Sequence, residues 1–101
     1  MKQSNPRSIV LQQAWLGDAV LALYVRERIL REQGKLDGDL YTRMTSNHFL
    51  SAIGEPSAVE AEIGEHYRIG GLPGAFQFIE ERLIPVYERQ EANRRKRLGL
   101  T

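Results

Sequence analysis

Apolar residues recur along this chain at helical spacing, and the longest apolar run, residues 14–25, carries a single formal charge, the carboxylate of Asp18. A surface helix would show a polar face every three or four residues, so this run predicts a helix enclosed by other helices or by a second subunit. We therefore expect Asp18 to be partly buried. Such a carboxylate must be paired, hydrogen-bonded or bound to a metal ion, because removing it from water is costly.

Helix start and stop signals mark the first half of the chain. Ser4-Asn5-Pro6 predicts the start of the first long helix, and Gly34 predicts its end. A second helix is expected over residues 39–53, with Asp37 or Asp39 as its cap.

The second half of the chain predicts further helices. The spacing of Ser57 and Glu60 is that of a capping box at the head of a third helix, which Gly70-Gly71 would end. A fourth helix would follow, bent or broken by Pro85, and residues 87–97 would continue as a polar helix. Because no strand-like alternation occurs, we expect an all-α, compact helical bundle of four to five helices.

Composition narrows the class of protein. A chain of 101 residues with 42% hydrophobic and 27% charged residues fits one globular domain covering residues 1–101. The absence of cysteine excludes disulfides and thiolate chemistry. No signal peptide is visible, and the apolar run is too short to span a bilayer, so we expect a cytoplasmic protein without membrane contact.

Charge is distributed unevenly, although the net charge is only +1. A basic tail covers about residues 88–101, whereas glutamates gather over residues 55–65. This pattern suggests that the basic tail binds a polyanion next to an acidic site. The alternative is that the tail is only the solvated, frayed end of a helix.

The carboxylates are the main candidates for chemistry. Glu60 is adjacent to small residues that would let its helix pack closely against the segment around Gly17, so we expect Glu60 to meet Asp18. Two carboxylates without a basic neighbour repel each other unless a proton or a cation lies between them. Mg²⁺ binds one or two carboxylates and completes its coordination shell with water molecules. A structural salt bridge from Asp18 to an arginine such as Arg26 or Arg43 is the alternative. His48 and His66 form no zinc motif.

Four stretches, in order along the chain, carry a resemblance to a known family. Leu16–Leu21 (LGDAVL) resembles the signature motif of ribonuclease III, and Val59–Gly64 resembles the second acidic motif of that family. Asp39–Asn47 and the segment from Tyr67 to Glu80 are similar to the helices that follow each motif. The resemblance is closest to the Mini-III branch, which also lacks a double-stranded-RNA-binding domain.

This resemblance implies a homodimeric endoribonuclease that hydrolyses double-stranded or structured RNA with Mg²⁺, or alternatively Mn²⁺, and needs no small-molecule cofactor. Its biological role would be RNA processing, with rRNA maturation as one example. Asp18 and Glu60 would be the catalytic and metal-binding residues, and the first helix would form the dimer interface. The interface residues would include Trp15, Leu16, Ala19 and Ala22. The expected RNA contacts are Arg43, Ser46, Asn47, Arg89, Arg94, Arg95, Lys96 and Arg97.

Departures from the family pattern leave alternatives open. Ala14 and Ser57 stand where typical ribonuclease III domains have two further acids, and the connection over residues 54–56 is shortened. One alternative is therefore a ribonuclease III-like protein that binds RNA without cutting it. Another is a helical, dimeric protein-interaction module in which Asp18 pairs with an arginine.

Overall fold

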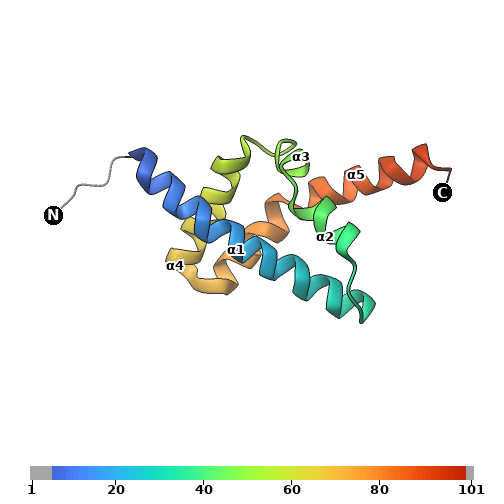
Figure 1. Ribbon diagram of the computed structural model, residues 1–101, viewed down its shortest axis with the longest axis horizontal. Helices are drawn as coiled ribbons and strands as arrows, with labels where there is room; N and C mark the ends of the chain where they lie inside the picture. The colour runs from blue at the N-terminus through green and yellow to red at the C-terminus, as the bar shows by residue number, and fades with distance from the viewer. Residues whose placement is uncertain (1–5, 100–101) are drawn as a thin grey trace.

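The computed structural model describes residues 6–99, and within this range the chain is helical and contains no strand (Figure 1). The predicted all-α class is therefore confirmed. Two short helices, α2 and α3, connect the long helices α1 and α4, and the long helix α5 follows α4 after one residue, so the division into helices differs from the predicted one. The helices are α1 (Pro6–Gln33), α2 (Gly38–Thr45), α3 (Asn47–Leu50), α4 (Pro56–Arg82) and α5 (Ile84–Arg97).

The ends of α1 follow the sequence signals. The helix begins at Pro6, while Ser4 and Asn5 lie outside the described residues. It ends at Gly34, which has a φ of 70° and donates its N–H to the Leu30 carbonyl at 2.9 Å. Glycine adopts this left-handed conformation without the penalty that a side chain would bring.

The predicted second helix is interrupted by a serine. Asp37 caps α2 by accepting a hydrogen bond from the N–H of Leu40 at 3.0 Å. Ser46 then ends α2 and starts α3, because its hydroxyl accepts a hydrogen bond from the N–H of Phe49 at 3.1 Å. The prediction of a single helix over residues 39–53 was wrong. A serine hydroxyl that accepts a hydrogen bond from the N–H three residues later favours the start of a new helix.

The start of α4 also differs from the prediction. Glu55, not Ser57, caps this helix, since its carboxylate accepts a hydrogen bond from the N–H of Ala58 at 2.8 Å and Pro56 takes the first helical position. The predicted capping box was wrong, and Glu60 is therefore free of that role. The expected break falls at Gly71, whose φ of 65° and ψ of −164° are not helical, so α4 consists of two helical segments.

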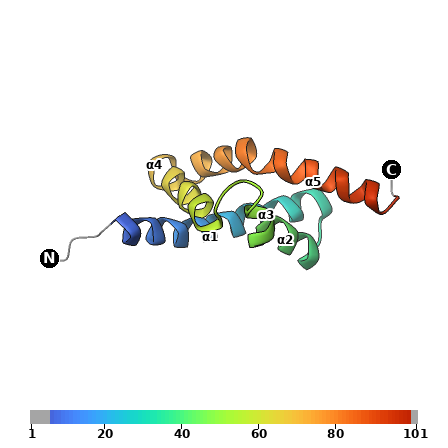
Figure 2. The same ribbon diagram turned by 90° about the horizontal axis from the view of Figure 1, so that it is seen from above.

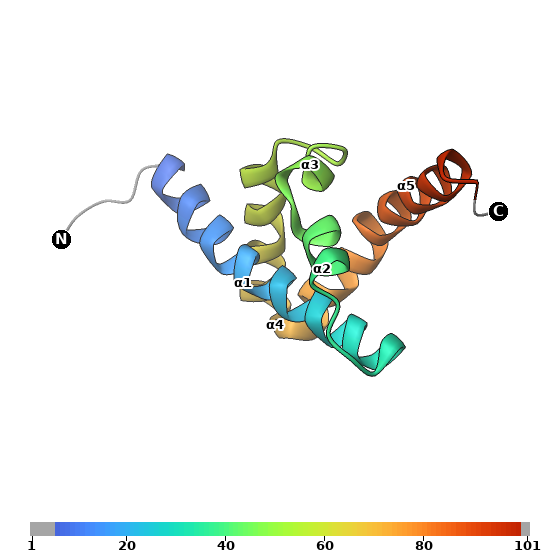
Figure 3. The same cartoon turned by 45° about the vertical axis from the view of Figure 1, so that its right-hand side comes forward.

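The core lies where α1 crosses α4, and α2, α3 and the start of α5 close it (Figures 1 and 2). Its largest fully buried side chains come from the four helices α1 to α4 and from Leu83, the residue between α4 and α5, whereas the distal half of α5 extends away from the body (Figure 3). They are Phe49, Leu21, Met44, Leu50, Ile63, Ile79, Leu83 and Val25.

Helix α1 is covered by other helices of this chain on one side only. Its other face exposes Leu11, Trp15, Leu23 and Leu30, so other helices of this chain do not cover that face, and cover by a second subunit stays a prediction. By length and composition, α1 is also apolar enough to cross a membrane, although the core helices of soluble proteins and signal sequences meet the same criterion.

Candidate functional site

Helices α1 and α4 approach each other backbone to backbone. A Cβ atom at Gly17 would lie 1.8 Å from the carbonyl oxygen of Glu60, and one at Gly64 would lie 2.0 Å from the carbonyl oxygen of Gln13. Each helix thus places a glycine against the backbone of the other. This reciprocal contact, which we call the glycine crossing, fixes the position of α1 along α4, because a shift by one residue would bring a side chain into the contact.

The glycine crossing brings Asp18 and Glu60 together, because Asp18 follows Gly17 and Glu60 lies opposite it. Burial raises the pKa of Glu60 to about 7, and Asp18 contributes by accepting a hydrogen bond from the protonated carboxyl and by repelling the ionised one. Glu55 adds a smaller repulsion. Glu62 and Glu65 lie exposed on other faces of α4, as their helical spacing predicts.

One expectation about Asp18 was wrong, and the alternative of a salt bridge to an arginine is not found within the described residues either. Its side chain is exposed in this chain rather than partly buried, because it lies at the edge of the crossing and α1 is covered on one side only. It also forms no salt bridge with an arginine within residues 6–99. Arg26 lies over the ring of Tyr41 at 5.0 Å, and Arg43 faces Glu91.

The carboxylate pair is a minimal donor set. Within the described part of the chain, no group of three or more histidine, aspartate or glutamate side chains could hold a metal ion. Ala14 is buried at 8% exposure and Ser57 is partly buried, and neither side chain carries a carboxylate that could extend the pair. Any cation here would therefore take two protein carboxylates and complete its coordination with water or substrate oxygens.

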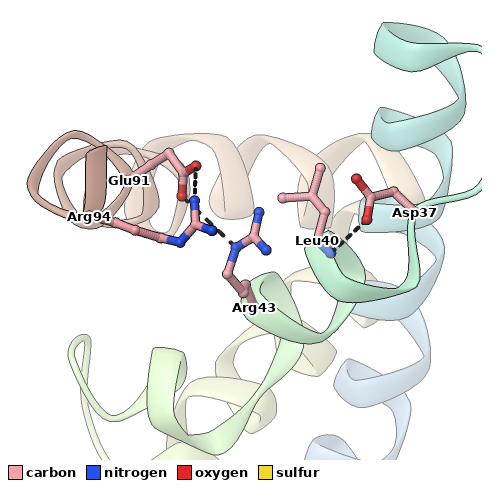
Figure 4. Close-up of polar contacts among 5 residues, drawn as sticks. All are labelled: Asp37, Leu40, Arg43, Glu91 and Arg94. Atoms are coloured by element: carbon pink, nitrogen blue, oxygen red, sulfur yellow. Dashed lines mark hydrogen bonds and ion pairs between the residues drawn. The ribbon is translucent and has the colours of Figure 1, made fainter. Parts of the chain in front are cut away.

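A second cluster of predicted residues lines a pocket between α2 and α5 with a volume of about 520 Å³. Arg43 comes from α2, whereas Arg94 comes from α5, and both face Glu91 (Figure 4). The Glu91 carboxylate lies 3.3 Å from Nη1 of Arg94 and 4.0 Å from Nε of Arg43. We call this cavity the basic pocket, after its arginines. Its remaining lining residues are Thr42, Ser46, His48, Tyr87, Gln90, Asn93 and Arg97.

The other predicted RNA contacts do not line this pocket. Arg89, Arg95 and Lys96 are exposed on other faces of α5, because a helix distributes a continuous basic run around its axis. Asn47 is exposed at the start of α3. Ser46 lines the pocket, but its hydroxyl oxygen already accepts the capping hydrogen bond, which leaves its proton as the group free to donate.

Sequence reasoning missed the acidic and aromatic residues of the basic pocket. Glu91 was overlooked because it lies within a basic tail, and Tyr87 because it was assigned to a polar helix. The helical spacing of residues 87, 90, 91, 94 and 97 places them on one face of α5 and could have identified them.

The expected dimer residues on α1 differ in exposure. Trp15 is 79% exposed and Ala19 is exposed, whereas Leu16 and Ala22 are partly covered. An indole this open to water is unusual for so large an apolar group, and it lies on the face of α1 that faces away from α4.

Comparisons of the chain with family models, with curated proteins and with solved structures found no match.

Proposed function

We propose that this protein is an Mg²⁺-dependent endoribonuclease that hydrolyses phosphodiester bonds of double-stranded or structured RNA. The observation that carries the proposal is the meeting of Asp18 and Glu60 at the glycine crossing, where no basic side chain of residues 6–99 forms an ion pair with either carboxylate. Their residue types and positions are also those that the resemblance to ribonuclease III assigns to the metal site.

The carboxylate pair fits a hard divalent cation. Two carboxylates that face each other repel when both are ionised, and the raised pKa of Glu60 reports this repulsion together with burial. Oxygen ligands of this kind suit Mg²⁺, and Mn²⁺ accepts the same donors. When bound, the ion supplies positive charge at the phosphodiester and the acidity that makes water a nucleophile at neutral pH. Asp18, being exposed, leaves the pair open to a large substrate.

Basic side chains elsewhere on the chain support an RNA substrate. Arg89, Arg95 and Lys96 are exposed along α5, whose distal end projects from the body of the molecule (Figure 3). Such groups contact backbone phosphates, which follow the shape of the RNA rather than its sequence. Binding should therefore weaken steeply as salt rises.

The exposed face of α1 supports a homodimer. Burying Trp15 against a second copy would contribute about 3 kcal/mol by the usual relation between apolar area and free energy. Leu11, Ala19 and Leu23 extend the same face. A dimer through α1 would place two carboxylate pairs in one assembly, since Asp18 lies on the same helix. We place the dimer in the cytoplasm, where structured RNA is processed.

A cleavage assay tests the proposal. Purified protein is incubated with long double-stranded RNA and Mg²⁺, beside the variants Asp18→Asn and Glu60→Gln and the control Glu62→Gln. Glu62 is an exposed acid on the same helix and does not face Asp18. We expect cleavage by the wild type and by Glu62→Gln, and its loss in the other two variants with the helical circular dichroism spectrum unchanged.

Full activity of Asp18→Asn would overturn the assignment. A second candidate, RNA binding without cleavage, is favoured by the two missing acids, because the packed position of Ala14 has no room for a third ligand from α1. Retention of RNA at low salt without cleavage in either Mg²⁺ or Mn²⁺ would select this candidate.

A further inference from the structure

We propose that the basic pocket between α2 and α5 is a binding site for a phosphate monoester, carried either by a free nucleotide or by the phosphorylated end of a single-stranded RNA. The pocket is built by helices other than the pair that holds Asp18 and Glu60. The proposal is therefore independent of ribonuclease activity.

Three guanidinium groups surround the pocket from two directions. Arg43 approaches from α2, and Arg94 and Arg97 approach from α5, one turn apart (Figure 4 shows the first two). Guanidinium groups bind phosphate oxygens through paired, charge-assisted hydrogen bonds, which an ammonium group cannot match. Ser46 supplies a hydroxyl donor from the α2 side, whereas the hydroxyl of Thr42 already donates to the Gly38 carbonyl at 3.0 Å.

The charge of the pocket matches a dianion. Its three arginines carry three positive charges and Glu91 one negative charge, so the lining is left with two positive charges when His48 is neutral. A phosphate monoester carries roughly 1.5 to 2 negative charges at neutral pH, whereas each diester of an RNA backbone carries only one. The pocket is thus better matched to a terminal phosphate than to the side of a duplex.

Glu91 contacts the two arginines unequally. Its carboxylate lies 3.3 Å from Nη1 of Arg94, within hydrogen-bond distance, but 4.0 Å from Nε of Arg43, beyond it. Within the described residues, that Arg43 nitrogen is buried without a hydrogen-bond partner. The Glu91 carboxylate therefore satisfies Arg94 but not Nε of Arg43, and a phosphate with more acceptor oxygens would relieve this deficit.

The size of the pocket favours more than an isolated phosphate. Its volume of about 520 Å³ lies in the usual range for organic ligands and leaves room for a sugar and a base. Tyr87 lines it, and the ring of Tyr87 is held by an edge-on contact with Phe49 at 6.2 Å. An aromatic ring next to arginines is the usual environment of an unpaired base.

Calorimetric titration with AMP tests the site in the absence of metal. We expect AMP to bind and adenosine, which lacks the phosphate, to bind at least about tenfold more weakly, the usual effect of losing charged hydrogen bonds. Arg97→Gln should weaken AMP binding by a similar factor, whereas Arg68→Gln, which removes an equal charge from an exposed part of α4, should leave it unchanged. Glu91→Gln should strengthen binding, because it removes the competing carboxylate.

Two RNA probes distinguish the sources of the phosphate. A short single-stranded RNA with a 5′-phosphate should bind more tightly than the same RNA with a 5′-hydroxyl if the site takes chain ends, and AMP should then be the weaker ligand. Equal binding of both RNAs together with tight AMP binding would assign the site to free nucleotides. Equal affinity for AMP and adenosine, or equal AMP binding by Arg97→Gln and the wild type, would overturn the proposal.

Discussion

The glycine crossing should be the least tolerant contact in the fold, and Gly17→Ala tests it. The added methyl group would lie 1.8 Å from the carbonyl oxygen of Glu60 and 2.9 Å from the backbone nitrogen of Gly64. Cβ atoms essentially never come closer than 3.0 Å to such neighbours, so the two helices must separate by more than about 1 Å. Neither neighbour can rotate away, because both atoms belong to a helix backbone.

The magnitude follows from two opposing effects. Overpacking of a well-packed interface costs about 1–3 kcal/mol, and here the strain also loosens the buried side chains on both sides of the crossing. Alanine gains up to about 1 kcal/mol over glycine in helix propensity, which offsets part of that cost. We expect a net loss of about 2 kcal/mol of unfolding free energy, which corresponds to roughly 8–16 °C in melting temperature for a domain of this size.

The assay is urea unfolding followed by circular dichroism at one protein concentration, with Gly70→Ala as the matched control. Gly70 is a glycine of α4. Its φ is not positive, and a Cβ atom there would meet nothing within 4 Å. This control should be as stable as the wild type or up to about 1 kcal/mol more stable. If Gly17→Ala unfolds at the same urea concentration as Gly70→Ala, the close approach of α1 and α4 is refuted.

Two further predictions concern the carboxylate pair and the exposed face of α1. Because Glu60 keeps its proton up to about pH 7 in the folded state but only to about 4.5 when unfolded, the folded state binds more protons between these values. The free energy of unfolding should therefore fall by about 1 kcal/mol as pH rises through this window, a value already reduced for the screening of a partly exposed group by solvent. In thermal melts, Glu60→Gln should abolish this dependence of stability on pH. Trp15→Ala should convert a dimer into a monomer in analytical ultracentrifugation, whereas Leu98→Ala, which shortens an exposed apolar side chain outside α1, should not. A wild type that sediments as a monomer and co-sediments with lipid vesicles would show instead that this face contacts a membrane.

The sequence predicted the helical class and the helix ends that depend on local chemistry. Pro6, Gly34 and Asp37 act as expected, because their effects arise within one turn of backbone. The roles of Ser46 and Glu55 were missed. Several residues near each position could cap a helix, and the choice between them depends on how the neighbouring helices pack.

The meeting of Asp18 and Glu60 could be anticipated because the small residues around them have a purely steric effect. The exposure of Asp18 could not, since an apolar run does not reveal which of its faces another helix covers. The basic pocket was predictable only in part. Its arginines were visible as charges, but Glu91 acquires its role from Arg43, which lies far away along the chain.

The break in α4 at Gly71 has a stereochemical consequence. A Cβ there would meet only the Cδ atom of Pro73, at an ordinary 3.6 Å, so space does not exclude a side chain. The backbone angles do, because a φ of 65° with a ψ of −164° belongs to a region that only glycine among the genetically encoded residues enters readily. Handedness rather than size sets this restriction: the backbone angles at Gly71 are ones that a D-amino acid adopts readily, whereas L-alanine at this position would strain the backbone.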